Sequence, residues 1–244
     1  MISPKNPQQL LLDIKLDESI SLENFIKCDS TNTVLSILGN VVESSSISSS
    51  FLLWGREGVG KNYLMQALNR DLLNQNMKTA FVALSDPRIN EPEILNGLDQ
   101  MDAVFIEDLD KLRDSEEWES ALFNLINQSL FNETKLFLSS QCVAQDLTVR
   151  LKDLRSRLLA FTAIEIPEIT ENEKIEALKQ SAERKGIELE ERTVKYILTY
   201  TSRNLSDLLK LLSELDDFSL EKKKKLSPSL VRELLSERSS SLHI

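Results

Sequence analysis

The chain contains very little histidine and cysteine, which leaves almost no room for several kinds of catalytic and metal site. Its 244 residues include one histidine, His243, and two cysteines, Cys28 and Cys142. A single histidine beside the C-terminus argues against histidine-based catalysis and histidine metal sites. Two cysteines are too few for a disulfide framework or a zinc cluster, so we expect reduced, buried thiols.

Long hydrophobic runs and an excess of positive charge are also missing. No apolar run approaches the roughly 18 residues of a membrane span, and the N-terminus lacks a hydrophobic signal region. We therefore expect a cytoplasmic protein with no membrane partner. The net charge of −10 disfavours broad non-specific DNA binding, because such binding relies on Lys and Arg to neutralise phosphates.

Glycine is scarce, and half of it lies in one short turn. Of the 6 glycines, Gly55, Gly58 and Gly60 fall in the run G-R-E-G-V-G-K that ends at Lys61. An apolar strand pattern precedes this run and a helical apolar pattern follows it. The run matches the phosphate-binding loop G-x-x-x-x-G-K. Its glycines let the backbone N–H groups approach the phosphates of a nucleotide, and Lys61 is expected to reach the β- or γ-phosphate.

The loop departs from this motif at Asn62, where a Ser or Thr normally holds Mg²⁺. An amide oxygen is a weaker ligand, so we expect nucleotide binding to persist and hydrolysis to be impaired. Glu107 and Asp108 end another apolar strand pattern, where acids are costly unless they meet a cation or hydrogen-bond donors. We predict that Asn62 and Glu107 hold Mg²⁺ and that Asp108 orients the attacking water. The alternative is an acidic pair that caps a strand–helix loop.

Strand and helix patterns alternate through the first two thirds of the chain, which predicts a parallel sheet with helices on both faces. The five expected strands are 51–54, 79–84, 103–106, 135–140 and 163–166, and a short helix is expected at 91–98. From Thr170 onward the patterns are helical only, with a capping box at Thr170–Glu173, a C-cap at Gly186 and helices at 190–201, 204–215 and 228–236. We predict a tail at 1–19, an α/β nucleotide-binding domain at 20–168 and a small all-helical lid at 169–244.

The predicted tail contains the run Q-L-L-L-D-I, which begins at Gln9 and includes Leu10 and Leu12. Three consecutive leucines on an extended arm indicate a partner surface. The alternative is that they pack on the protein's own core as an edge strand.

A phosphate loop, an acidic strand end, an arginine-bearing segment and a helical lid, in this order, resemble an AAA+ ATPase module. Short runs narrow the resemblance: N-F-I from Asn24, L-W-G-R-E-G from Leu53, P-E-I-L-N-G from Pro92, E-W-E from Glu117 and K-L-S-P from Lys225. They are similar to the Hda family, which is related to the replication initiator DnaA. The resemblance covers essentially the whole chain, and the chain ends where DnaA would begin its DNA-binding domain.

This resemblance implies an AAA+ P-loop domain with a parallel five-stranded sheet, followed by the lid. It implies ADP or ATP with Mg²⁺ as cofactor, and a set of nucleotide contacts. Those residues are Phe25, Ile26, Gly55, Arg56, Glu57, Gly58, Val59, Gly60, Lys61, Asn62 and Tyr63. Ser140 and Gln141 take the polar sensor 1 position, and Arg157 aligns with an arginine finger that acts on a neighbour's ATP. Arg150 and Arg155 are alternatives for that role.

The resemblance also implies partners. Gln9, Leu10 and Leu12 resemble the peptide with which the family docks on the DNA polymerase sliding clamp, so DNA is reached only through the clamp. The expected function is negative regulation of replication initiation, by stimulating hydrolysis of DnaA-bound ATP. An arginine expected in sensor 2 is replaced by Ser206, for which Arg203 or Lys210 could substitute. The alternatives are an autonomous AAA+ ATPase and an adaptor that does not stimulate hydrolysis, so it stays open whether the chain is an enzyme. Whether the resting protein is a monomer or a homodimer is open too.

Overall fold

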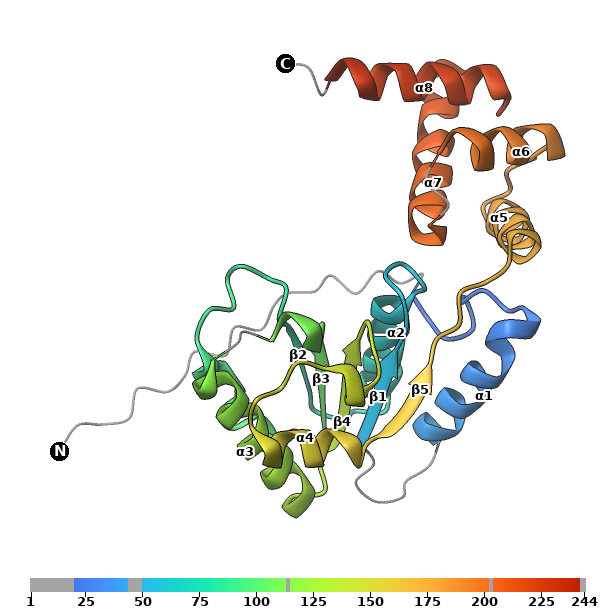
Figure 1. Cartoon of the computed structure of the whole chain (residues 1–244). Helices are drawn as coiled ribbons and strands as arrows, with labels where there is room; N and C mark the ends of the chain where they lie inside the picture. The colour runs from blue at the N-terminus through green and yellow to red at the C-terminus, as the bar shows by residue number, and fades with distance from the viewer. Residues whose placement is uncertain (1–19, 44–49, 113–114, 202–203, 242–244) are drawn as a thin grey trace.

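The computed structural model describes residues 20–43, 50–112, 115–201 and 204–241 of the chain. They form an α/β domain and a group of helices above the carboxyl ends of its strands (Figure 1). The candidate clamp-binding residues Gln9, Leu10 and Leu12, and the candidate sensor Arg203, lie outside the described residues. The domain limits predicted at 20 and 169 stay predictions.

The α/β domain is built on five parallel strands, as predicted. They are β1 (Ser50–Trp54), β2 (Thr79–Ala83), β3 (Ala103–Glu107), β4 (Lys135–Ser140) and β5 (Thr162–Glu165). Their order in the sheet is β2-β3-β4-β1-β5. The chain therefore leaves β1 for the far edge of the sheet and returns through β3 and β4. Because of this crossover, the loop after β1 and the acidic end of β3 lie on the two sides of β4, at the edge where open α/β sheets bind ligands.

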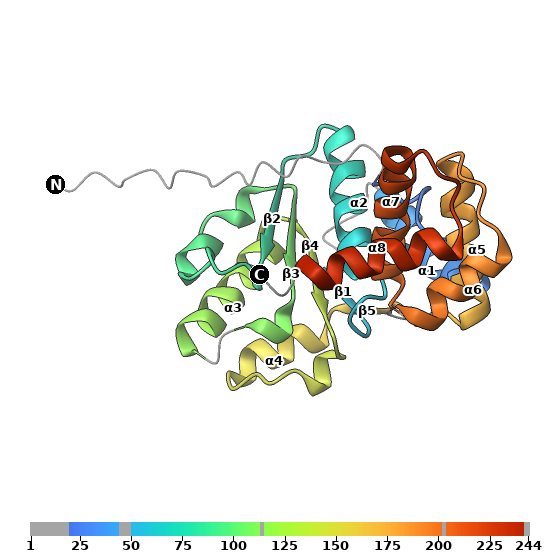
Figure 2. The same cartoon turned by 90° about the horizontal axis from the view of Figure 1, so that it is seen from above.

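Alternate residues of each strand face opposite layers of helices. On one face, strand residues such as Leu52, Val104 and Leu138 pack with α3 (Glu116–Phe131) and α4 (Lys152–Leu159). On the other face, strand residues including Phe51, Leu53 and Phe105 pack with α1 (Asp29–Glu43) and α2 (Lys61–Asn74). Figure 2, seen from above, shows the two layers on either side of the sheet. The near-continuous apolar sequence of the strands follows from this two-sided burial.

An aromatic ladder crosses four neighbouring strands on the α1 and α2 side of the sheet. The ring centroids of Phe51 and Phe137 lie 5.5 Å apart, those of Phe137 and Phe105 4.7 Å, and those of Phe105 and Phe81 5.7 Å. All three pairs are stacked nearly parallel. Such cross-strand aromatic pairs fix the register of neighbouring strands.

The prediction of a single short helix at 91–98 is wrong. The structure has two 3₁₀ turns there, η1 (Pro92–Leu95) and η2 (Leu98–Gln100). Gly97 between them takes the left-handed conformation, with φ 79°, and Asn96 is extended. These two conformations interrupt the helical hydrogen bonds, so the segment cannot continue as one helix.

The lid contains four helices within the part of the chain that the structure describes. They are α5 (Glu171–Arg184), α6 (Glu191–Tyr200), α7 (Leu205–Lys222) and α8 (Pro228–Ser241). The predicted capping box is confirmed: Thr170 Oγ1 accepts from the Glu173 N–H, and Glu173 Oε2 accepts from the Thr170 N–H. Gly186, with φ 69°, follows the end of α5 as expected. Helix α7 runs beyond the predicted 204–215 because Phe218 continues its buried face.

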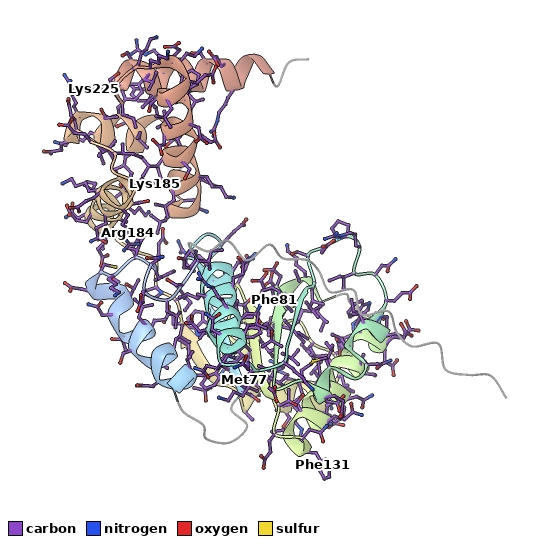
Figure 3. The ribbon with its side chains drawn as sticks, turned by 180° about the vertical axis from the view of Figure 1, so that it is seen from behind. Met77, Phe81, Phe131, Arg184, Lys185 and Lys225 are labelled. Carbon is purple, nitrogen blue, oxygen red and sulfur yellow. The ribbon has the colours of Figure 1, made fainter. Side chains whose placement is uncertain are left out.

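Two polar contacts join the first helix of the lid to the α/β domain. Glu173 Oε1 accepts hydrogen bonds from the N–H and the hydroxyl of Ser30 in α1, at 3.1 and 2.8 Å. Arg184 Nη1 donates to the carbonyl of Asn24 at 2.6 Å, and Figure 3 shows Arg184 on the side of the lid that faces the α/β domain. Hydrogen bonds from Thr170 and Ser30 lower the pKa of Glu173 to about 2. The carboxylate of Glu173 therefore caps α5 and ties it to α1 at the same time.

Candidate functional site: a phosphate-binding loop beneath a helical lid

The loop between β1 and α2 has the backbone that its glycines predict. Gly58 and Gly60 have φ of 81° and 100°, where side chains with a Cβ are strained. Both also touch other segments: a Cβ on Gly58 would lie 1.8 Å from Asn204 Nδ2, and one on Gly60 would lie 2.8 Å from Phe25 Cε2. The glycines thus give the loop its shape and let the lid and the segment before α1 close on it.

Lys61 is held inside this loop. The residue is 5% exposed, and its ammonium donates to the carbonyls of Gly55 at 2.6 Å and Arg56 at 2.9 Å. Burial lowers the pKa of Lys61, while nearby carboxylates, Asp110 first among them, act in the opposite direction. Phosphate oxygens of a nucleotide could replace the two carbonyl acceptors, because both are hydrogen-bond partners of the kind that an ammonium needs.

The two residues predicted as metal ligands lie together. Asn62 Nδ2 donates to Glu107 Oε2 at 3.2 Å, and Glu107 is 4% exposed. Its other oxygen, Oε1, is buried and has no hydrogen-bond partner among the described residues. Burial raises the pKa of Glu107 to about 8, the charge of Asp108 adds to the rise, and Lys61 opposes it. A buried carboxyl with an unsatisfied oxygen is a site that a cation would stabilise.

These residues fit Mg²⁺ only together with a nucleotide. Within the described ranges, no three His, Cys, Asp or Glu side chains are grouped so that they could hold a metal ion. Mg²⁺ commonly binds through one or two protein ligands plus substrate phosphates. Glu107 would supply the carboxylate, and Asn62 would supply its amide oxygen after the amide turns over, since the NH₂ group now faces Glu107. A bound Mg²⁺ would neutralise phosphate charge.

The raised pKa of Glu107 predicts a pH dependence of stability in the nucleotide-free protein. The folded protein keeps this proton up to about pH 8, whereas the unfolded chain loses it near 4.5. The stabilisation is therefore fully present below pH 4.5 and is lost as the pH rises through about 8. We expect the free energy of unfolding to fall by about 2 kcal/mol between pH 6 and pH 8. Urea denaturation measures this, and the fall should be absent in Glu107→Gln; parallel curves for both proteins would contradict the prediction.

Of the other predicted catalytic residues, Gln141 contacts Asp110, which the sequence interpretation missed, and Asp108 contacts Ser139. The N–H of Gln141 donates to Asp110 Oδ1 at 2.9 Å, and the N–H of Asp108 donates to Ser139 Oγ at 3.2 Å. Ser140 instead donates its hydroxyl to the carbonyl of Cys142. Asp110 is the third acid of the run E-D-L-D, and this was the only signal in the sequence that could have found it.

A cavity of about 100 Å³ lies between the loop, the segment before α1 and the lid. Six of the predicted nucleotide contacts line it: Phe25, Ile26, Arg56, Glu57, Gly58 and Val59. Tyr63 does not; its ring packs on Phe25 with centroids 5.6 Å apart, and its hydroxyl bonds to the backbone of Ser21. Three further residues line the cavity: Glu168 from the segment before the lid, and Lys174 and Asn204 from the lid itself. The sequence interpretation missed these three because nothing local to them indicates contact with a loop more than a hundred residues away.

A replacement of Gly58 tests whether this closed arrangement binds nucleotide. In Gly58→Ala the new Cβ would overlap the side chain of Asn204 and residue 58 would keep an unfavourable φ, so the side chain of Asn204 must move and the contact between lid and loop is disturbed. We expect ADP affinity to fall about tenfold or more, measured by titration calorimetry, with the fold retained. Gly39→Ala is the matched control: nothing lies within 4 Å of its Cβ, and we expect unchanged ADP affinity. Equal affinity of Gly58→Ala and wild type would contradict the assignment.

The three arginines considered as arginine fingers have different surroundings. Arg155 Nη2 donates to the carbonyl of Gln145 at 2.8 Å. The backbone N–H of Arg150 is bound by the buried carboxylate of Glu119. Arg157 is exposed on α4, and its guanidinium makes no hydrogen bond or ion pair with any described residue. This guanidinium is therefore available to another molecule. Of the proposed sensor substitutes, Lys210 is exposed on α7 and does not line the cavity.

Comparison with known proteins places this geometry in a family. Residues 16–165 match the family model of the bacterial DnaA ATPase domain. The chain belongs to the bacterial DnaA ATPase-domain family. Residues 171–235 match the model of the Hda lid domain. A DnaA-type ATPase domain followed by an Hda lid is the arrangement of an Hda-like protein. The chain is therefore Hda-like and belongs to a family of replication-initiation regulators.

Solved structures of DnaA share the fold. Domain III of DnaA from Thermotoga maritima aligns with a TM-score of 0.75 at 16% identity, over 91% of this chain and 97% of that one. DnaA from Aquifex aeolicus, solved with AMPPCP, aligns with a TM-score of 0.73 at 20% identity, over 92% of this chain and 71% of that one. The AAA+ fold with a helical lid, expected from the sequence, is confirmed. An uncharacterized protein of Haemophilus influenzae is 29% identical over 230 residues, covering 93% of this chain and 98% of that protein. Among the described residues, no helix is both long and apolar enough to cross a membrane.

Proposed function

We propose that this DnaA-family protein is a negative regulator of replication initiation. It holds an adenine nucleotide with Mg²⁺ in the loop at 55–61, docks on the DNA-loaded sliding clamp through Gln9, Leu10 and Leu12, and stimulates hydrolysis of ATP bound to DnaA. The clamp and DnaA are its partners, and Arg157 completes the ATP site of DnaA in trans.

The observation that carries this proposal is the exposed guanidinium of Arg157, which has no polar partner in the part of the chain that the structure describes. An arginine that stabilises charge on a transferring phosphoryl group must be presented without a competing carboxylate. Helix α4, which carries Arg157, lies at the end of the α/β domain away from the lid and from the chain's own loop (Figure 1). That position favours action on a second molecule over action on the chain's own nucleotide.

The geometry of the chain's own site favours this function over autonomous ATP turnover. The amide of Asn62 directs a donor at the carboxyl that would bind the metal, and the pKa of that carboxyl, Glu107, is raised to about 8. To bind a catalytic Mg²⁺, the amide of Asn62 would have to turn over and Glu107 would have to lose its proton, whereas binding of phosphate by the loop requires neither change. We therefore propose that weak intrinsic hydrolysis accompanies the regulatory role.

A single-turnover assay tests the proposal. DnaA loaded with labelled ATP is mixed with sliding clamps assembled on DNA, and hydrolysis is followed with and without this protein. We expect stimulation that requires the clamp and that is lost in the tail variant Gln9→Ala, Leu12→Ala. If wild type binds the clamp and does not stimulate hydrolysis, the protein is an adaptor. Steady ATP turnover by this protein alone, with no effect on DnaA, would indicate an autonomous ATPase.

A further inference from the structure

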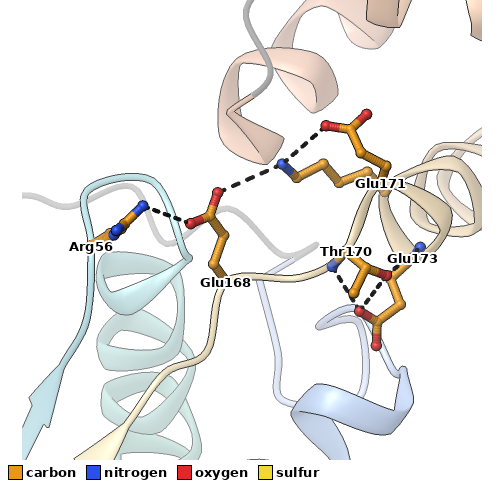
Figure 4. Close-up of polar contacts among 6 residues, drawn as sticks. Arg56, Glu168, Thr170, Glu171 and Glu173 are labelled. Carbon is orange, nitrogen blue, oxygen red and sulfur yellow. Dashed lines mark hydrogen bonds and ion pairs between the residues drawn. The ribbon is translucent and has the colours of Figure 1, made fainter.

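The cavity contains a buried cation that the proposed function leaves unused. Lys174, on α5 of the lid, is 6% exposed and lines the cavity beside the phosphate loop. Its ammonium lies 3.8 Å from Glu168 Oε1 and 4.0 Å from Glu171 Oε1. Figure 4 marks the ion pairs of Glu168 and Glu171 with dashed lines. Both distances are too long for hydrogen bonds. Within the described part of the chain Lys174 therefore has two ion pairs and no hydrogen-bond acceptor, an unfavourable state for a buried ammonium.

Glu168 connects this lysine to the phosphate loop. Its second oxygen, Oε2, accepts from Arg56 Nη1 at 3.3 Å, so the carboxylate lies between the loop and the lid. It is half exposed and also lines the cavity. A carboxylate has about four acceptor positions, and the interactions with Arg56 and Lys174 leave some of them open. The cavity therefore presents one group that can only donate, Lys174, beside one that can only accept, Glu168.

The remaining walls suit a flat ring. Phe25, Ile26, Ile169 and Leu205 are apolar and belong to the lining of this 100 Å³ cavity. Ligand pockets of this type combine apolar walls with a few polar groups that fix orientation. On the purine edge that carries N7, adenine has a donating amine beside the accepting N7, whereas guanine has two acceptors there, O6 and N7. A carboxylate beside an ammonium complements the first pattern, and the carboxylate repels the oxygen of the second.

We propose that Lys174 and Glu168 select the adenine base. Lys174 donates to the ring nitrogen N7, and Glu168 accepts from the exocyclic amine. This inference rests on the proposed nucleotide binding and names the groups that decide which nucleotide is bound. It also gives the lid a direct contact with the ligand through Lys174 on α5. This contact matters because Ser206 stands on α7 where the sensor 2 arginine was expected.

The test compares three nucleotides on the full chain: ADP, GDP and the diphosphate of purine riboside, which lacks the exocyclic amine. The variants are Lys174→Met, Lys174→Arg and Glu168→Gln. Lys179→Met is the matched control, because Lys179 lies on the same helix, pairs with Glu176 and does not line this cavity. Dissociation constants come from titration calorimetry, and melting curves confirm that each variant is folded.

We expect wild type to prefer ADP over GDP by about tenfold or more. Glu168→Gln should lose about tenfold in ADP affinity and nothing for the purine riboside nucleotide. Lys174→Met should lose about tenfold for ADP, with partial recovery in Lys174→Arg and no change in Lys179→Met. If wild type binds no adenine nucleotide, the proposed function fails. If it binds ADP and both variants weaken all three nucleotides equally, or none, then only the selection of adenine by this pair is overturned.

Discussion

Replacing Arg157 by alanine should remove nearly all stimulation of DnaA-bound ATP hydrolysis, a loss of about a thousandfold in the single-turnover rate. The reason is electrostatic: an arginine supplied in trans stabilises the charge that develops on the γ-phosphoryl oxygens, and alanine supplies none. Clamp binding and ADP binding should not change, because Arg157 lies on α4, outside both the predicted tail and the nucleotide cavity. A rapid-mixing assay with labelled ATP on DnaA gives the rate directly.

Arg155→Ala is the matched control for this experiment. Arg155 lies on the same helix and is also exposed, and its guanidinium is bound to the carbonyl of Gln145. We expect it to keep at least a third of the wild-type stimulation. Loss of stimulation in Arg155→Ala with full activity of Arg157→Ala would assign the finger to Arg155. Equal activity of both variants and wild type would exclude an arginine finger on α4.

Replacing Glu119 by alanine should lower the free energy of unfolding by about 3 kcal/mol. Glu119 is 2% exposed, and its carboxylate accepts hydrogen bonds from the N–H groups of Arg150, at 3.0 and 3.1 Å, and Leu151, at 2.6 Å. These N–H groups lie at the start of α4, which has no side-chain cap of its own. Alanine removes the buried carboxylate that accepts from both partly buried donors. Urea denaturation followed by circular dichroism measures the change.

The control for Glu119 is Glu117→Ala, two residues earlier on α3. Glu117 is exposed, so its replacement should change stability by less than about 0.5 kcal/mol. Because Glu119 fixes the start of the helix that carries Arg157, Glu119→Gln should also reduce stimulation of DnaA while ADP affinity stays unchanged. An equal effect of the Glu117 and Glu119 variants on unfolding would show that the buried hydrogen bonds do not hold α4.

Local patterns in the sequence were sufficient for the sheet and the phosphate loop. The three central strands β3, β4 and β1 carry runs of buried apolar residues, and Gly58 and Gly60 have the conformations that the loop motif requires. The segment at 91–98 was mispredicted because the left-handed conformation of Gly97 separates it into two short turns. Helical periodicity in the sequence does not reveal the φ of one residue.

Contacts between distant segments could not be predicted from periodicity. Ser30 and Glu173 are 143 residues apart, and Glu119 and Arg150 are 31 apart. The run that contains Glu119 was recognised only as a likeness to a family, with no role attached. Lys174 was not considered as a ligand contact, because a lysine on a predicted helix is expected to be exposed to solvent. The choice among three arginines likewise required the structure, since it depends on which guanidinium already has a partner.

The shared cap at Glu173 has a mechanical consequence. One carboxylate holds the first turns of both α1 and α5, so Glu173 is a point about which we expect the lid to rotate. Among the lid helices, α8 lies farthest from that point (Figure 1), so a small rotation of the lid about Glu173 would displace α8 more than the other lid helices. A fluorescent label on α8 is thus the most sensitive place on the lid to follow its rotation. Glu173→Ala removes the hydrogen bonds to Ser30 and Thr170 and should broaden the distribution of label positions without changing the phosphate loop.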